Sequence, residues 1–383
     1  MEKLAMLSEG VQNFLDGYDK TPVRSRRFAK DRLLHFHRLI EGVRAGRVPQ
    51  WIFMKEAQTS SDFPLMFADT LDRIMLGGYS ETPYTWNMIA RRATPRDFRD
   101  VKRFAMDGNR GRLTRVGGAN ATASYPERSK SETQYSYGLS VFGAKTGYSW
   151  QSFINDDLGA LDDNPMDFGV SSRRTEEYEA TRLFANNTTY YSAGNANRVV
   201  TANGAATNNP ALSIAGLQSA MTVLANHVDS DTEPIAIDTV VLVVPPALEI
   251  TARNILNATA IEITEAGGTS NQKLIAQNWM RNRVQLAVNY YLPIVDETYG
   301  ATGWYLFAAP NSSRPAMEVG FLRGNEQPQM FMKSPNAVRI GGGQVSPMDG
   351  DFDSDDLMFK VRHCWGGTMM DPKMSVFSEG DGS

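Results

Sequence analysis

An acidic run near the carboxyl end is the stretch of this chain that most resembles a metal-binding loop. It opens Asp349-x-Asp351-x-Asp353, the spacing with which calcium loops begin. Such a loop also needs a glycine at its sixth position and a bidentate glutamate at its twelfth, but Ser354 and Lys360 stand there. We therefore interpret the run as a solvated acidic loop and predict no metal site within the subunit, with a weak divalent-ion site between subunits as the alternative.

Other residues suited to catalysis or phosphate binding are also poorly placed. Cys364 follows His363, but neighbours on a strand point to opposite faces and cannot form a thiolate pair. His35 and His37 are two residues apart on an expected helix, so they do not share a face. The glycines at 341–343 lack the Gly-Lys-Ser/Thr ending of a phosphate loop, and no G-x-S-x-G or H-E-x-x-H motif occurs. We predict no catalytic residue, no cofactor and no metal, and hence a protein that is not an enzyme.

Composition and charge narrow the class of protein. The 383 residues, 42% of them apolar, are enough for two or three domains. The net charge of −4 gives no global attraction to nucleic acid or anionic lipid. A single cysteine suits a reducing cytoplasm, the first residues lack the features of a secretory signal, and no apolar run is long enough to cross a membrane. We expect a protein made and used in a cytoplasm, with no membrane partner.

The charges are unevenly spread along the chain. Residues 91–150 contain twelve Lys or Arg against five Asp or Glu. Residues 156–167 and 349–356 each contain five Asp and no basic residue. A basic segment and two acidic ones on a nearly neutral chain predict that subunits pair by charge.

The helix-forming stretch around which the chain is organised follows Asn164-Pro165. Asparagine can cap free N–H groups, and proline lacks only a donor that the first helical turn leaves unbonded. The residues that follow favour helix up to Asn186-Asn187, so the helix would be roughly 35 Å long at about 1.5 Å per residue. Its apolar stripe is thin, which predicts that one face lies toward solvent or a partner.

The segment before this helix is predicted to be an extended hairpin. Residues 93–150 are rich in Gly, Ser and Thr, contain short alternating patches such as 141–148, and place Gly108, Gly111 and Gly117-Gly118 near a tip. A structureless loop of this length is unusual in a compact domain. A two-stranded excursion projecting onto a neighbour is the better interpretation.

The first 92 residues are predicted to be helical pieces and an arm. Residues 24–43 form a basic amphipathic pattern typical of a surface helix. Residues 51–92 are apolar and are broken at Pro64, Gly77-Gly78 and Pro83. They are expected to pack on something else rather than to close a core.

Residues 211–320 carry the pattern of a compact α/β domain. Asn209-Pro210 is expected to start an amphipathic helix, and 239–244 is a β-branched run typical of a strand covered on both faces. Further strands are expected at 284–292 and 304–308.

The tail returns to strands. Short strands are expected at 317–322 and 329–332, and 357–365 alternates as a half-buried strand. Gly366-Gly367 is expected to form a turn before a last strand that ends at Val376.

Taken in this order, the chain resembles the tailed-bacteriophage major capsid proteins of the Hong Kong 97-type fold, most nearly the Mu-like head-subunit branch and its relatives in actinophage-type genomes. The similarity extends from about Gln58 to the end of the chain. The matching stretches are S-S-D-F-P-L-M-F-A-D-T-L-D-R-I-M-L-G-G-Y at 60–79, P-R-D-F-R-D-V-K-R-F at 95–104, F-I-N-D-D-L-G-A-L at 153–161, V-L-V-V-P-P-A-L-E-I-T-A-R at 241–253 and F-K-V-R-H-C-W-G-G-T-M-M-D-P at 359–372.

The resemblance implies an α+β capsid fold in five parts. They are an N-terminal arm (1–92), an extended β-hairpin called the E-loop (93–150), a peripheral domain with a long spine helix (151–210), an α/β axial domain (211–320) and return strands that complete the peripheral domain (321–383).

The resemblance also implies a major head protein that self-assembles into hexamers and pentamers of an icosahedral shell. The shell would enclose packaged double-stranded DNA, with weak non-specific contact to it, and would be assembled in the bacterial host cytoplasm as part of the virion. A portal and possibly scaffolding or decoration proteins are the other expected partners. Because each E-loop would lie over the next subunit, we predict contacts from its basic residues (Arg110, Arg112, Arg115, Arg128, Lys130) to acidic residues of a neighbour (Asp156, Asp157, Asp162, Asp163, Glu176).

Two alternatives stay open at this point. An encapsulin-type nanocompartment has the same architecture around cargo enzymes, and co-purifying protein rather than nucleic acid would identify it. A cytosolic hydrolase that uses carboxylates of the 211–320 domain is a more distant alternative, because paired carboxylates are defined by the fold and not by sequence spacing.

Overall fold

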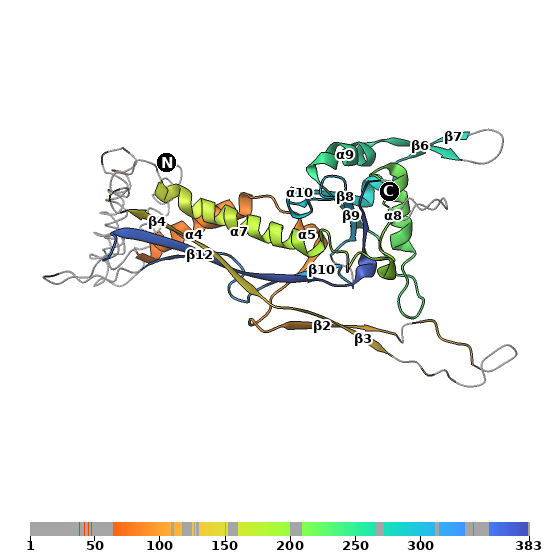
Figure 1. The fold of residues 1–383 in the computed structure, drawn as a ribbon, viewed down its shortest axis with the longest axis horizontal. Helices are drawn as coiled ribbons and strands as arrows, with labels where there is room; N and C mark the ends of the chain where they lie inside the picture. The colour runs from red at the N-terminus through yellow and green to blue at the C-terminus, as the bar shows by residue number, and fades with distance from the viewer. Residues whose placement is uncertain are drawn as a thin grey trace, which may run out of the picture. The chain divides into compact units, whose positions relative to one another are not determined.

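The fold is seen in a computed structural model (Figure 1) that describes residues 38, 42, 45, 47, 64–108, 111–116, 125, 127, 130–149, 151, 160–199, 209–265, 272–310, 314–333, 340 and 352–381. The chain divides into two compact units. The first comprises Met1–Glu81, Gly143–Ser172 and Gln327–His363, and the second comprises Thr82–Phe142, Arg173–Glu326 and Cys364–Ser383.

In the first unit, helix α4 (Pro64–Glu81) packs closely on the early part of helix α7 (Ala160–Phe184). A Cβ at Gly78 would crowd the carbonyl oxygen of Met166, and a Cβ at Gly169 would overlap that of Met75. Glycine is needed at both positions because the two backbones approach too closely for a side chain. The expected break at Gly77-Gly78 is therefore wrong: α4 continues through it.

The strands of the first unit confirm the expected alternation as far as Arg362, whereas His363, Cys364 and Trp365 are all buried. Strand β12 (Asp356–Met369) pairs with β11 (Gln329–Met332) and with β4 (Ser140–Ser149). Leu357, Phe359 and Val361 are buried, whereas Lys360 and Arg362 are exposed and lie over the ring of Phe331. The patch at 141–148 thus belongs to β4, a strand that pairs with β12, and not to the hairpin as expected.

The second unit is built on a four-stranded sheet. Its order is β13 (Ser375–Ser378), β9 (Trp304–Ala308), β5 (Val240–Val244), β8 (Val284–Val288), with β5 and β8 parallel and the other pairs antiparallel. Every residue of β5, β9 and β13 is buried, which confirms that the β-branched run is covered on both faces.

Two hydrophobic clusters cover this sheet. On one face Leu242 joins residues of helices α8 (Ile214–Ala225) and α9 (Glu249–Asn257), among them Leu217 and Ile255. On the other face Val241 and Val243 join Phe184 of α7. The alternation of β5 side chains between two cores explains why the strand is apolar at every position.

Three boundaries differ from the sequence-based expectation. Helix α7 begins at Ala160, so Asn164-Pro165 lies inside its early turns and does not cap it. Helix α8 begins after Ser213, whose hydroxyl accepts from the N–H of Gly216 at 3.0 Å, and not at Asn209-Pro210. Strand β8 ends at Val288, because the Asn289 side chain accepts from the N–H groups of Tyr291 and Leu292 and turns the chain into helix α10 (Leu292–Val295).

The sheet that contains β11, β12 and β4 has five strands, in the order β1-β10-β12-β11, with β4 also paired to β12. Helix α5 (Trp86–Ile89) leads into β1 (Ala90–Ala93), which pairs in parallel with β10 (Met317–Phe321), and β10 pairs antiparallel with β12. The turn expected at Gly366-Gly367 is wrong, since both glycines lie inside β12, opposite Gly320 and Val319 of β10.

Two hairpins complete the described chain. Strands β2 (Val101–Asp107) and β3 (Ser131–Tyr137) pair antiparallel from Val101↔Tyr137 to Asp107↔Ser131, which confirms a two-stranded excursion (Figure 1). Strands β6 (Ala260–Glu265) and β7 (Gln272–Gln277) form the other.

Several expectations fall on residues that the structure does not describe. The amphipathic pattern at 24–43 and the glycines at 341–343 lie outside the described residues, apart from residues 38 and 42. In the described part of the chain, no helix is long and apolar enough to cross a membrane.

Candidate functional site at the base of the hairpin

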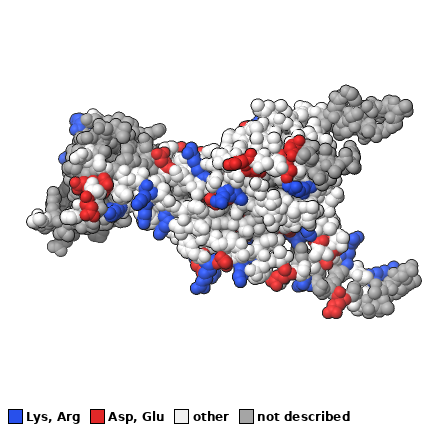
Figure 2. All heavy atoms as spheres, viewed as in Figure 1, with Lys and Arg blue, Asp and Glu red and all other residues white. Residues whose placement is uncertain are grey.

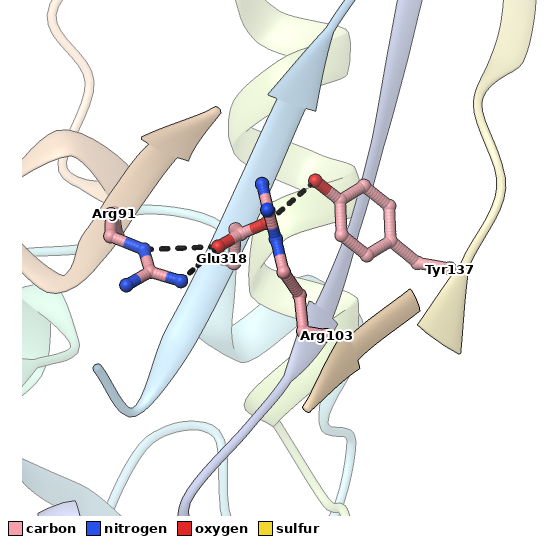
Figure 3. Close-up of polar contacts among 4 residues, drawn as sticks. All are labelled: Arg91, Arg103, Tyr137 and Glu318. Atoms are coloured by element: carbon pink, nitrogen blue, oxygen red, sulfur yellow. Dashed lines mark hydrogen bonds and ion pairs between the residues drawn. The ribbon is translucent and has the colours of Figure 1, made fainter. Parts of the chain in front are cut away.

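A buried carboxylate, Glu318 of β10, joins the β2–β3 hairpin to the sheet that contains β1, β10 and β12 (Figure 3). Its Oε1 accepts from Nε of Arg103 at 2.7 Å and from the hydroxyl of Tyr137 at 2.9 Å, so it holds both strands, β2 and β3. Its Oε2 accepts from Arg91 of β1, the residue directly opposite in the sheet, with Nε at 3.0 Å. The Glu318 side chain is 0% exposed, whereas Arg91 and Arg103 are 40% and 41% exposed. We call these four residues the hairpin anchor.

Two glycines make room for the hairpin at this place. A Cβ on Gly320 would lie 2.8 Å from the Tyr137 ring and hydroxyl, and a Cβ on Gly366 would overlap the carbonyl oxygen of Gly138. Gly320 and Gly366 are opposite each other in β10 and β12. Because positions 320 and 366 carry no side chain, the sheet leaves space there, and Tyr137 and Gly138 at the end of β3 occupy it.

Burial and hydrogen bonding shift the pKa of the Glu318 carboxyl in opposite directions. Burial alone would raise the pKa of the Glu318 carboxyl, but hydrogen bonds from Arg103, Arg91 and Tyr137 outweigh it and hold the pKa below its usual value. Burial, followed by the Glu318 charge, raises the pKa of the Tyr137 hydroxyl, which stays a donor. Both carboxylate oxygens are occupied, so the arrangement positions the hairpin and exposes no reactive group.

The lowered pKa predicts an acid-sensitive contribution to stability. A carboxyl whose pKa is lower in the folded chain stabilises the fold above its unfolded value and loses that contribution as the pH falls through the folded pKa. We expect the free energies of unfolding of the wild-type and Glu318→Gln chains to differ at neutral pH, to start to approach each other as the pH falls below about 4.3, the unfolded value, and to converge only below the folded pKa. Urea denaturation across a pH series measures this, and a difference independent of pH would contradict it.

A second buried carboxylate fixes the segment that leads into β1. Glu177 of α7 accepts from the N–H groups of Thr85 and Trp86 at 2.9 and 3.2 Å, from the Thr85 hydroxyl, and from Nδ2 of Asn289 at 3.0 Å. Burial raises the pKa of Glu177, although the bonds from Thr85 and Trp86 oppose that shift. One side chain thus ties helix α7 to α5 and to the end of β8.

Beyond β2 the hairpin loop contacts a turn of its own chain. The N–H of Gly111 donates to Asp231 Oδ2 at 2.9 Å. The N–H and Nε of Arg112 donate to Glu233 Oε1 at 3.0 and 2.9 Å. We call residues 229–233 the acceptor turn.

The residues predicted to lie between subunits differ in whether the structure describes them and in whether they are exposed. Arg110, Arg128, Asp156 and Asp157 lie outside the described residues, and the side chains of Asp162 and Asp163 in α7 are not described. Arg115 and Lys130 are exposed, and Arg112 is bound to Glu233 in its own chain. No contact with a neighbour is tested, so these stay predictions.

Glu176 requires a correction. It is fully buried, and its Oε2 accepts from Nη1 of Arg173 at 2.9 Å and from the Trp86 indole at 3.2 Å. In the folded subunit it is therefore not exposed to a neighbour. Sequence periodicity could not reveal this, because the Glu176-Glu177 pair turns inward on a helix whose apolar stripe is thin.

Sequence reasoning also missed the hairpin anchor. Arg91 and Arg103 belong to the basic segment, but that segment was expected to bind a neighbour. The available signal was Glu318 itself, a single acid between apolar residues in the strand M-E-V-G-F, since a charge placed there needs a partner. Among the described residues, no three His, Cys, Asp or Glu side chains gather as a metal site would need.

The chain is similar to known phage proteins in sequence and in structure. The family model described as "Phage capsid protein" matches residues 133–376. Similar solved structures include one from Microbacterium phage Oxtober96 (11% identity, 78% of this chain and 91% of that chain, TM-score 0.46) and the capsid of cyanophage P-SCSP1u (8% identity, 77% and 87%, TM-score 0.44). The capsid of an empty GTA particle is similar over 79% of this chain and 95% of that chain, at 13% identity and TM-score 0.42. No curated protein matches the chain.

The matched region begins within the hairpin and ends in the last strand, and so includes β3, α7, the four-stranded sheet and the return strands. It covers well over half of the chain. The resemblance to phage capsid proteins is thereby confirmed, and the chain belongs to the phage capsid protein family.

Proposed function

We propose that this phage capsid protein is the major head subunit, which self-assembles into hexamers and pentamers of an icosahedral shell around double-stranded DNA. The observation that carries the proposal is the hairpin anchor. Among the described residues, β2 and β3 pair only with each other and form a two-stranded ribbon. The buried carboxylate of Glu318 holds this ribbon on strand β10. A ribbon held in this way is suited to reaching another subunit.

The ribbon presents an exposed face that fits a protein partner. Phe104 and Met106 of β2 are each more than half exposed, and they lie beside Gln134 and Glu132 of β3. Arg103, their neighbour in the strand, points to the opposite face, toward Glu318. Large exposed apolar side chains on a ribbon favour a second copy of the chain as their cover.

We further propose the five-part division into arm, E-loop, peripheral domain, axial domain and return strands, with β4 outside the E-loop and β13 in the sheet of the axial domain. We also propose assembly in the host cytoplasm, no catalytic activity, and a portal and possibly scaffolding or decoration proteins as partners. Contact with packaged DNA would be weak. On the face drawn in Figure 2, Lys and Arg lie interspersed with Asp and Glu, and the net charge is −4.

The state of assembly tests this function. We expect the purified protein to give megadalton particles, or hexamers and pentamers that convert to them, by size exclusion with light scattering and by negative-stain microscopy. Nucleic acid inside such particles would favour the phage head, whereas co-purifying cargo protein would favour an encapsulin-type compartment. A chain that stays monomeric at high concentration, even when its own phage's assembly proteins are supplied, would contradict the proposal.

Charge reversal in the hairpin loop tests its part in assembly. We expect Arg112→Glu with Arg115→Glu to abolish shells, because like charges would then face the acidic partner surface. The matched control is Arg96→Glu with Arg99→Glu, the same change of charge in the exposed connection before β2. Particles of normal yield and shape from the first variant, seen by electron microscopy, would rule out this role.

A further inference from the structure

The acceptor turn is a small binding site for two residues of the hairpin loop. Two carboxylates, Asp231 and Glu233, receive two consecutive backbone N–H groups and the Arg112 guanidinium, from a segment about 120 residues away in the chain. Backbone N–H groups and an arginine fork match carboxylate oxygens in geometry as well as charge.

The turn is formed independently of the loop that it binds. Asp229 Oδ1 accepts from the N–H groups of Asp231 and Glu233 at 2.9 and 3.0 Å, and the Asp229 N–H donates to the carbonyl of Glu233 at 2.9 Å. Thr232 adopts a left-handed conformation, with φ of 64°, which these bonds support. The backbone that carries Asp231 and Glu233 is therefore preorganised, so that donors from any chain can reach the two carboxylates.

The contact itself is exposed and is separable from the ribbon. The Arg112 side chain is 87% exposed, and Leu113, which follows, is 92% exposed. An exposed ion pair of this kind stabilises the fold only weakly, because solvent screens both charges. The ribbon is held at its base by the bonds from Arg103 and Tyr137 to Glu318, which are separate from the contacts of residues 111–112 with the turn.

We propose that the contact is exchanged between subunits in the shell: the acceptor turn of one copy binds Gly111 and Arg112 of a neighbouring copy. This inference rests on the proposed function. Exchange of an identical element keeps every hydrogen bond and adds a link between subunits, so it costs little.

A disulfide between the two sides distinguishes a contact within one chain from a contact between chains. A Cβ on Gly111 would lie 3.0 Å from the Asp231 Cβ, so a shift of roughly half an ångström would bring the pair to the roughly 3.5–4.5 Å that a disulfide needs. The one native cysteine, Cys364, is buried. The test variant is the full chain with Gly111→Cys and Asp231→Cys, kept reduced, assembled, then oxidised and run on a non-reducing gel.

Exchange predicts a ladder of covalent multimers of the 42.4 kDa chain from particles, and a monomer from unassembled protein. A mixture of the two single-cysteine variants should give dimers only, and each single variant alone should give none. Intact particles that yield only monomers, whether bridged within the chain or not bridged at all, would overturn the exchange. Failure of the wild-type chain to assemble would instead count against the proposed function.

A charge-swap mixture tests the same idea if the cysteine variant does not assemble. Chains with Arg112→Glu carry acids on both sides of the contact, and chains with Glu233→Arg carry bases on both sides. Exchange predicts that each alone loses particles and that an equal mixture regains them, because every contact between unlike chains is again of opposite charge. If only the double variant, Arg112→Glu with Glu233→Arg, regains particles and the mixture does not, the contact stays within one chain and the proposal is wrong. Asp238→Arg, the same change at an exposed acid nearby, is the matched control for Glu233→Arg.

Discussion

Replacing Glu318 by alanine is expected to lower the free energy of unfolding by about 3 kcal/mol, because it breaks a buried ion pair and leaves its partners unmatched. Arg91 and Arg103 would face each other without the carboxylate, and the Tyr137 hydroxyl would lose its acceptor. The value lies at the low end for buried pairs because both guanidinium groups are partly exposed and so are screened by solvent.

This substitution is also expected to detach β2 and β3 from β10, because Arg103 and Tyr137 lose their shared acceptor. Urea denaturation gives the loss of stability, and hydrogen exchange should show faster exchange of the β2 and β3 amides while β5 and β9 stay protected. Glu132→Ala, an exposed acid on β3, is the matched control and should change stability by less than about 0.5 kcal/mol. A Glu318→Ala chain with wild-type exchange in β2 and β3 would refute the role of the anchor.

Replacing Glu177 by alanine is expected to cost about 3 kcal/mol, because each buried donor left unsatisfied costs about 1–3 kcal/mol. The N–H groups of Thr85 and Trp86 would lose their acceptor, while Asn289 would keep its bond to the Thr181 hydroxyl at 2.9 Å. The segment at α5 and the start of β1 would lose its tie to α7.

Two further substitutions distinguish the loss of hydrogen bonds from the loss of charge at Glu177. Glu177→Gln keeps an acceptor oxygen and removes a charge whose burial is unfavourable, so it should cost less than alanine. Glu179→Ala removes a surface carboxylate of the same helix that pairs with Arg182, and should cost about 0.5 kcal/mol or less. Equal losses for Glu177→Ala and Glu179→Ala, measured by urea denaturation, would show that the buried bonds do not contribute.

The parts of the fold that the sequence predicted are those set by local pattern. The run at 240–244 is apolar at every position because both faces of β5 are buried, and that feature is visible without a structure. The same holds for the alternation of Leu357, Phe359 and Val361 with Lys360 and Arg362.

Predictions based on glycine failed where the glycine makes room for a segment that is distant in the chain. Gly78 and Gly366 were interpreted as a break and a turn, but each makes room for another segment, at Met166 and Gly138. A glycine needed for close approach and a glycine needed for a turn look the same in sequence.

The sequence by itself determined the family, the order of hairpin, long helix, sheet and return strands, and the concentration of basic residues in the hairpin. Only the tertiary structure decided which charges are held inside the subunit. Glu318 meets Arg103 across 215 residues and Glu177 meets Thr85 across 92, and Glu176 turns inward to Arg173. Charge is a property of single residues, but burial and pairing arise from the packing of segments that are far apart in the chain, and no local pattern encodes them.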